Sequence, residues 1–150
     1  MILQKRGDDV FSKKKMLCVL VISFLISIIF LITFFNLLAE EPQSENFGAV
    51  ILLILVFVLA NIGAYQFSAR SINYFSLGYF LLLLVCLAFG FFISATDTDY
   101  NVFMALLGIL ISPFYGLIYV SEHWHYVALA ISVAMIALSA VLGFKRKMEK

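Results

Sequence analysis

Charged residues are scarce in this sequence and are missing altogether from five long segments. Asp, Glu, Lys and Arg make up 13% of the 150 residues, and 64% of the residues are hydrophobic. Soluble domains contain roughly 25% charged and roughly 45 to 50% apolar residues. The uncharged segments are 22 to 26 residues long and cover 16–39, 46–69, 71–96, 100–121 and 123–144. About 20 apolar residues in an α-helix cross the roughly 30 Å hydrocarbon core of a bilayer. The sequence therefore predicts an integral membrane protein.

The same absence of charge bears on function. Proton-coupled pumps and exporters need a titratable carboxylate at depth, because such groups carry the proton across the membrane. Nucleophilic catalysis needs a base beside a Ser or Cys, and no His or carboxylate lies at depth to act as one. The net charge of +1 disfavours a nucleic-acid binder, which needs a basic surface. We therefore expect neither an enzyme nor a nucleic-acid partner, and assign no catalytic residue.

Cysteine and histidine are also rare, with two of each. Cys18 and Cys86 differ in membrane depth by about 15 Å at the α-helical rise, too far for a disulfide, so we expect two free thiols. His123 and His125 flank Trp124, and on a helix this spacing places the two rings on opposite sides. A zinc site needs three or four protein ligands. We therefore predict no metal site and no cofactor.

The positions of the charges divide the chain into three parts: a basic N-terminal segment at 1–15, a transmembrane bundle at 16–144 and a basic C-terminal tail at 145–150. Short connections between apolar segments predict antiparallel neighbouring helices. We expect an all-α, polytopic transmembrane helical bundle of five helices, with approximate spans at 17–38, 47–67, 74–95, 102–121 and 125–144.

The distribution of basic residues predicts the orientation. Residues 1–15 carry five Lys and Arg, whereas the connection at 40–46 carries three Glu and no basic residue. Because cytoplasmic segments are rich in Lys and Arg, we expect a multi-pass protein of the cell membrane with a cytoplasmic N-terminus. Five crossings then place the basic tail outside, in conflict with the same rule. An even number of crossings would remove that conflict.

The fourth segment is the weakest of the five, because Gly108, Pro113 and Gly116 interrupt it. Proline removes a backbone donor and clashes with the preceding turn. We favour a kinked but complete span, since membrane helices tolerate proline. The alternative is four spanning helices plus one re-entrant segment, which would imply a polar pathway because lipid does not tolerate irregular backbone.

Other candidate residues are polar or small. Asn36, Asn61 and Gln66 are the strongly polar residues in or near the spans, and Asn61 is the deepest. Each can hydrogen-bond to a neighbouring helix, and Asn61 could instead contact a substrate. Ala130 and Ala134 begin a row of small residues, which lets a helix pack closely against a helix of this chain or of another subunit.

Two functions remain open. The first is a non-catalytic accessory or regulatory protein that binds another membrane protein through its helix faces. The alternative is a small transporter or channel component with a path near Pro113. Besides the lipid bilayer, the expected partner is another membrane protein or further copies of this chain. An enzyme acting at the outer surface rests only on loop carboxylates and is the weakest hypothesis.

Overall fold

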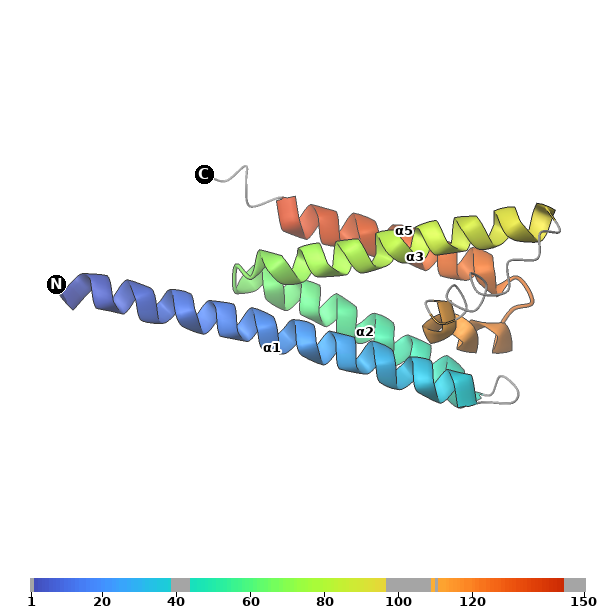
Figure 1. Ribbon diagram of the computed structural model, residues 1–150, viewed down its shortest axis with the longest axis horizontal. Helices are drawn as coiled ribbons and strands as arrows, with labels where there is room; N and C mark the ends of the chain where they lie inside the picture. Colours follow the sequence, from blue (N-terminus) through green and yellow to red (C-terminus); the bar gives the residue numbers. More distant parts are fainter. Residues whose placement is uncertain (1, 39–43, 97–108, 110, 145–150) are drawn as a thin grey trace.

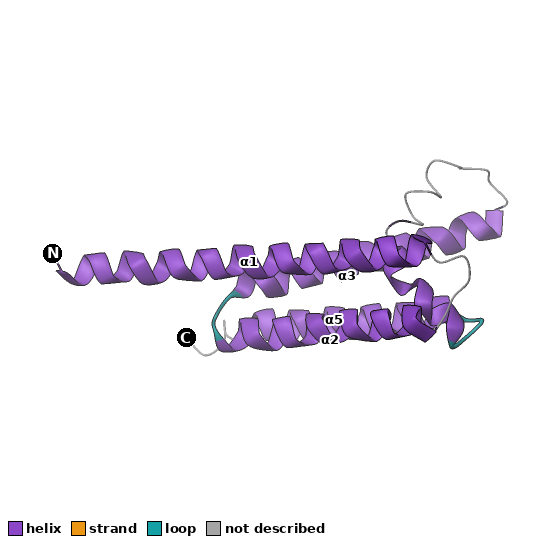
Figure 2. Ribbon diagram, turned by 90° about the horizontal axis from the view of Figure 1, so that it is seen from below, coloured by secondary structure: helices purple, strands orange, loops and turns teal. Residues whose placement is uncertain are grey.

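The computed structural model describes residues 2–38, 44–96, 109 and 111–144, and nearly all of these residues lie in helices. In chain order these are α1 (Ile2–Leu38), α2 (Ser44–Gln66), α3 (Arg70–Thr96), the 3₁₀ helix η1 (Ser112–Tyr119) and α5 (Trp124–Phe144) (Figure 1). The described residues contain no strand (Figure 2). The predicted all-α bundle is confirmed.

Four of these helices are long and apolar enough to cross a membrane: Lys13–Phe34 within α1, all of α2, Arg70–Gly90 within α3, and all of α5. Figure 1 shows that α1 and α3 run from one end of the bundle to the other and that α2 and α5 return. The chain is therefore a small integral membrane protein. At 1.5 Å per residue the 37 residues of α1 extend about 56 Å, so α1 is longer than the hydrocarbon core is thick.

The segment 102–121 does not appear as a fifth complete span among the described residues; 102–108 and 110 lie outside them. The eight residues of η1 extend about 16 Å at 2.0 Å per residue, roughly half of the hydrocarbon core. The end of α3 and the beginning of α5 lie at the same end of the bundle (Figure 1). Among the described helices there are therefore four that can span a membrane, the number in the alternative prediction, and the described part of 102–121 forms one short helix.

This arrangement removes the conflict over the C-terminal tail. Phe144, the last residue of α5, lies at the same end of the bundle as the beginning of the α1 span (Figure 1). The five crossings favoured from the sequence would have put that residue at the opposite end. The tail itself, 145–150, lies outside the described residues.

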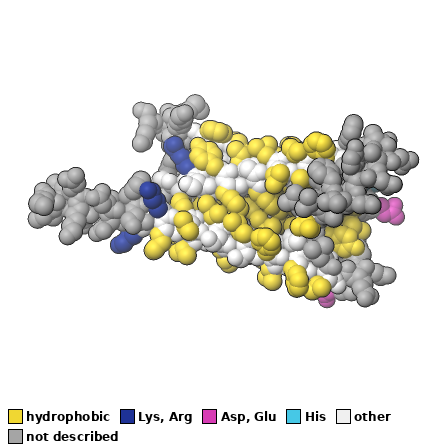
Figure 3. Space-filling view, in the orientation of Figure 1, with side chains coloured by type: hydrophobic (Ala, Val, Ile, Leu, Met, Phe, Trp, Pro, Cys, Tyr) yellow, Lys and Arg dark blue, Asp and Glu magenta, His cyan; other side chains and the backbone are white. Residues whose placement is uncertain are grey.

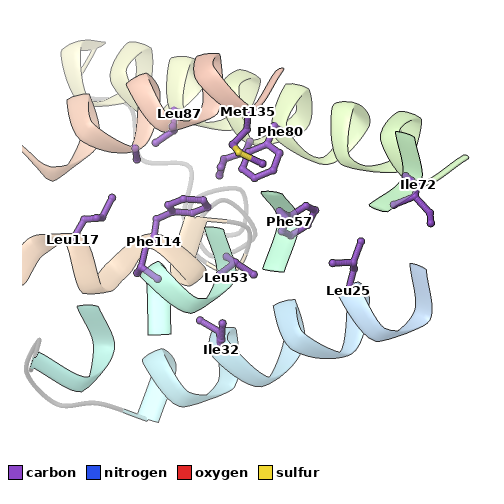
Figure 4. Close-up of a cluster of buried hydrophobic side chains, with 14 of the residues drawn as sticks. Leu25, Ile32, Leu53, Phe57, Ile72, Phe80, Leu87, Phe114, Leu117 and Met135 are labelled. Carbon is purple, nitrogen blue, oxygen red and sulfur yellow. The ribbon is translucent and has the colours of Figure 1, made fainter. Parts of the chain in front are cut away.

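The helices pack around the central pair formed by α2 and α3, with α1 and α5 on either side of it (Figures 1 and 2). Their common core contains the fully buried rings of Phe57, Phe80 and Phe114 together with Leu25 and Met135 (Figure 4). The rings of Phe57 and Phe80 meet edge to face with centroids 5.0 Å apart, an arrangement worth about 0.5–1.5 kcal/mol beyond area burial. Aromatic packing therefore fixes α2 against α3.

The two ends of the bundle carry opposite charge. Lys13 and Lys14 begin the α1 span and Arg70 begins α3 at one end, whereas Glu45 begins α2 and Glu122 precedes α5 at the other. On the face shown in Figure 3, basic and acidic side chains lie at opposite ends with many apolar side chains between them. We call the first the basic end and the second the acidic end. The apolar band between the charges is the part of the surface that we expect to face lipid.

The connection between α2 and α3 at the basic end is only three residues long and is closed by a Schellman motif. The Ala69 N–H donates to the Ala64 carbonyl at 2.8 Å, and the Ser68 N–H donates to the Tyr65 carbonyl at 3.4 Å. These two bonds are the 6→1 and 5→2 pair of that motif. Ser68 takes the left-handed conformation, with φ of 59°, where glycine is normally preferred because it has no Cβ.

Replacing Ser68 by Gly should therefore stabilise the protein. The left-handed conformation costs a non-glycine residue about 1–2 kcal/mol, most of which glycine avoids. We expect a gain of about 1 kcal/mol in the free energy of unfolding, measured by SDS titration of the purified protein in mild detergent with circular dichroism. Ser68→Ala is the matched control and should give no gain. A destabilised Ser68→Gly variant would contradict the assignment of this turn.

Candidate functional site

A chain of buried amides joins three segments at the acidic end of the bundle. The Asn36 side-chain amide near the end of α1 donates to the Ser112 carbonyl of η1 at 2.7 Å. The Asn46 amide of α2 donates to Asn36 Oδ1 at 2.8 Å. The Ser112 hydroxyl in turn donates to the Ile109 carbonyl at 2.9 Å. Because Asn36 and Asn46 are almost completely buried, these bonds lie in a medium where unpaired polar groups are costly.

The backbone of η1 lies directly against α2. A Cβ atom at Gly116 would overlap the backbone carbonyl group of Asn46, so glycine is required there for close approach. Pro113 stands in the first turn of η1, where its missing N–H leaves no bond unmade. Both residues are buried, whereas Gly108 lies outside the described residues. Pro113 and Gly116 weaken the fourth segment as a membrane span. The same two residues allow it to pack as a short helix within the bundle.

A second amide pair lies nearer the basic end. The Asn61 amide donates to the Phe57 carbonyl of its own helix at 2.9 Å. The Asn73 amide of α3 donates to Asn61 Oδ1 at 3.1 Å and to the Asn61 carbonyl at 3.3 Å. Both asparagines are fully buried. Asn61 thus bonds to protein groups on two helices, an interaction worth about 0.6–2 kcal/mol inside a membrane. Gln66, at the end of α2, is exposed.

The row of small residues in α5 is divided between two faces. Ala130 and Ala134 are exposed on the outside of the bundle. The buried face is formed by Ala128, Ser132, Met135, Ser139 and Gly143. A Cβ atom at Gly143 would lie 3.6 Å from Asn73 Cβ, so α5 approaches α3 closely through the other face. Of the two alternatives, contact within this chain does not involve Ala130 and Ala134 in the described structure, and contact with another subunit stays a prediction.

The two histidines lie closer together than the sequence suggested. The ring centroids of His123 and His125 are 6.1 Å apart, because α5 begins at Trp124 and His123 precedes its first turn. The expectation that a helix separates them is therefore wrong. No group of three or more His, Cys, Asp or Glu side chains that could hold a metal occurs within the described part of the chain. Cys18 and Cys86 are both free, as expected.

Three buried hydroxyls lack a hydrogen-bond partner in the described structure: those of Ser76, Tyr79 and Ser139. Tyr79 also lines a cavity of about 210 Å³ between α1 and α3, which we call the α1–α3 groove. Its other lining residues are Ile26, Ile29, Phe30, Thr33, Phe75 and Ile109. The Tyr79 ring stacks on Phe57 with centroids 5.2 Å apart. The groove is therefore apolar, with Thr33 and Tyr79 as its hydroxyl-bearing residues.

These arrangements are suited to holding helices together and to contacting other apolar surfaces. The described spans contain no charged side chain beyond their first turns, and their buried amides bond to one another or to the backbone. Comparison with protein-family models, with curated proteins and with solved structures finds no match for this chain.

The sequence did not identify two residues of the buried amide pairs, Asn46 and Asn73. Asn46 and Asn73 stand at the ends of predicted connections, where asparagine is common in turns, and were not assigned a role. Both lie within helices, three residues into α2 and four into α3. The available signal was that five asparagines flank or enter the apolar segments, since such residues in lipid need partners.

Replacing Gly116 by Ala should destabilise the protein, because the new methyl group would overlap the Asn46 backbone. We expect a loss of about 1–3 kcal/mol in the free energy of unfolding, measured by SDS titration. At Gly78 an added Cβ meets nothing within 4 Å, so Gly78→Ala is the control and should stabilise α3 by up to about 1 kcal/mol. Equal stability of the Gly116→Ala variant and the wild type would disprove the close contact.

Proposed function

We propose that this protein is a non-catalytic accessory or regulatory component of the cell membrane that binds another membrane protein through its helix faces. The proposal rests on the small number of α1 side chains that pack against the rest of the bundle. Among its described side chains only Leu25, Ile32, Thr33 and Asn36 are buried, and cavities lie beside it against α3 and against α2. A helix that contacts its own bundle along a narrow strip leaves most of its apolar surface for a partner.

The chemistry of the interior supports the same proposal over catalysis. The buried amides form bonds within the bundle, so they act as interhelical contacts. A catalytic site needs a nucleophile or metal, a base and a group that orients them. No such combination stands out among the buried polar residues of the described chain, which are Asn, Ser and Thr.

The packing of η1 favours an accessory role over a transport path near Pro113. Pro113, Phe114, Gly116 and Leu117 are all buried by protein, and Gly116 touches the α2 backbone. A conducting path needs polar groups or a hydrated opening along its length. Beside Pro113 the buried amides bond within the protein, as Asn36 does to Ser112 and to Asn46. Apolar side chains and the close contact at Gly116 fill the rest of the described segment.

We further propose that the basic end of the bundle faces the cytoplasm, on the basis of the positive-inside rule and the separation of charge in Figure 3. In a protein with Cys18 and Cys86 replaced by Ala, Glu122→Cys should react with an impermeant thiol reagent in intact cells. Ser71→Cys should react only after permeabilisation. Both positions are exposed at opposite ends of the bundle. The reverse labelling pattern would invert the orientation.

The partner is expected to contact the α1–α3 groove. Affinity purification of the tagged protein from its native membrane in mild detergent should yield a stoichiometric second membrane protein. Ile26→Trp fills the groove, and extra bulk in a packed interface costs about 1–3 kcal/mol, so recovery of the partner should fall about tenfold. Leu31→Trp is the control, since Leu31 is 68% exposed and lies outside the groove.

Two results would overturn this proposal. One is a preparation that contains only copies of this chain, which would redirect attention to a homo-oligomer. The other is equal recovery of a partner with Ile26→Trp and wild type but reduced recovery with Leu31→Trp, which would move the contact to the outer face of α1.

A further inference from the structure

A second cavity, of about 240 Å³, lies between α1 and α2 at the basic end of the bundle. We call it the basic-end cavity. Leu17 and Val21 of α1 form one wall and Gly63 of α2 forms another. Phe67 and Ala69 of the connection close it towards Ile72 of α3. All of its lining residues are apolar. Such a cavity suits a hydrocarbon chain and offers nothing to a polar solute, because a buried polar group there would lose its hydrogen bonds with water.

Cationic side chains stand next to this cavity in the chain. On α1, Lys13 precedes the lining residue Leu17 by four residues, so the two share a face of the helix. Lys14 is its neighbour, and both lysines are exposed. Arg70 lies between the lining residues Ala69 and Ile72, at the first position of α3. A cation there adds to the positive end of the helix dipole instead of offsetting it.

The described acidic side chains, Glu45 and Glu122, belong to helix ends on the far side of the apolar band. Asp8 and Asp9 precede Lys13 in the sequence, but residues 1–15 carry five Lys and Arg against these two Asp, so this segment has a net positive charge. The basic end therefore combines an apolar cavity at the depth of the acyl chains with a positive rim at the depth of the lipid headgroups. Basic pockets between transmembrane helices are the type of site that holds anionic lipid headgroups.

We propose that the basic-end cavity binds an anionic phospholipid, with one acyl chain between α1 and α2 and the phosphate group against Arg70 and the Lys13–Lys14 pair. The charge complementarity of the rim selects an anionic headgroup over a zwitterionic one. The bound lipid also fills the space that separates α1 from α2 at this end, and so steadies α1 against the bundle. This site is separate from the α1–α3 groove and does not depend on a protein partner.

Gly63 allows the cavity to be filled without disturbing the fold. It lines the cavity, and a Cβ atom there would meet nothing within 4 Å. Gly63→Leu should therefore occupy the space of the acyl chain. Gly78→Leu is the matched control, because Gly78 is equally open and lies outside the cavity. Arg70→Gln tests the rim and leaves the cavity unfilled.

The experiment is native mass spectrometry of the purified full-length protein in mild detergent, titrated with phosphatidylglycerol or with phosphatidylcholine of the same acyl chains. The wild type should retain phosphatidylglycerol in preference to phosphatidylcholine. Arg70→Gln should reduce that preference about fivefold, as expected for loss of one cation near an anionic headgroup. Gly63→Leu should reduce binding of phosphatidylglycerol about tenfold or more, whereas Gly78→Leu should bind as the wild type does.

Each contrary result has a definite meaning. Equal retention of the two lipids by the wild type would overturn the proposal. Loss of preference in Arg70→Gln with full retention in Gly63→Leu would show that the headgroup binds at the surface and that the cavity holds no chain. Circular dichroism spectra and size-exclusion profiles identical to those of the wild type exclude misfolding of either variant. If Gly63→Leu misfolds, the lipid preference of Arg70→Gln tests the proposal instead.

Discussion

The side chain of Asn36 makes the contacts on which the acidic end of the bundle depends. Its amide donates to the first carbonyl of η1 and its oxygen accepts the amide of Asn46, so α1, α2 and η1 meet at one buried residue. Hydrocarbon offers no hydrogen bonds to polar groups, which makes the loss of any of these contacts costly. Most of the 3₁₀ helix, from Ser112 to Leu117, is packed against protein. The glycine at 116 completes this arrangement by bringing η1 against the α2 backbone.

The position of α1 follows from the same contacts. Asn36 ties its last turns to η1 and α2, whereas its earlier turns are held mainly by Leu25 and Ile32. Cavities therefore open beside α1, one towards α3 and one towards α2 at the basic end. Association between membrane helices rests on close packing and hydrogen bonds. A helix that has few of either within its own chain is the natural place for a protein or lipid partner to add them.

The opposite side of the bundle is closed more tightly. Helices α3 and α5 form the most extensive helix contact, and Gly143 packs near Asn73 and Tyr74. The small buried side chains of α5 allow this approach, as small residues do in membrane helices generally. The two sides of the molecule therefore differ in packing: the α3–α5 pair is tightly packed and α1 is loosely packed.

Much of the fold could be predicted from the sequence, because an uncharged run of 22 residues or more is a local property that matches the bilayer thickness. The sequence by itself determined the membrane class, the positions of four spans and the separation of basic from acidic ends. Only the tertiary structure decided that the Pro113 segment forms a short buried helix, that Asn36 pairs with Asn46 and Asn61 with Asn73, and that Ala130 and Ala134 face outwards. Those outcomes depend on which distant segments meet, and helical periodicity does not specify the partner of a buried amide or the face of an almost uniformly apolar helix.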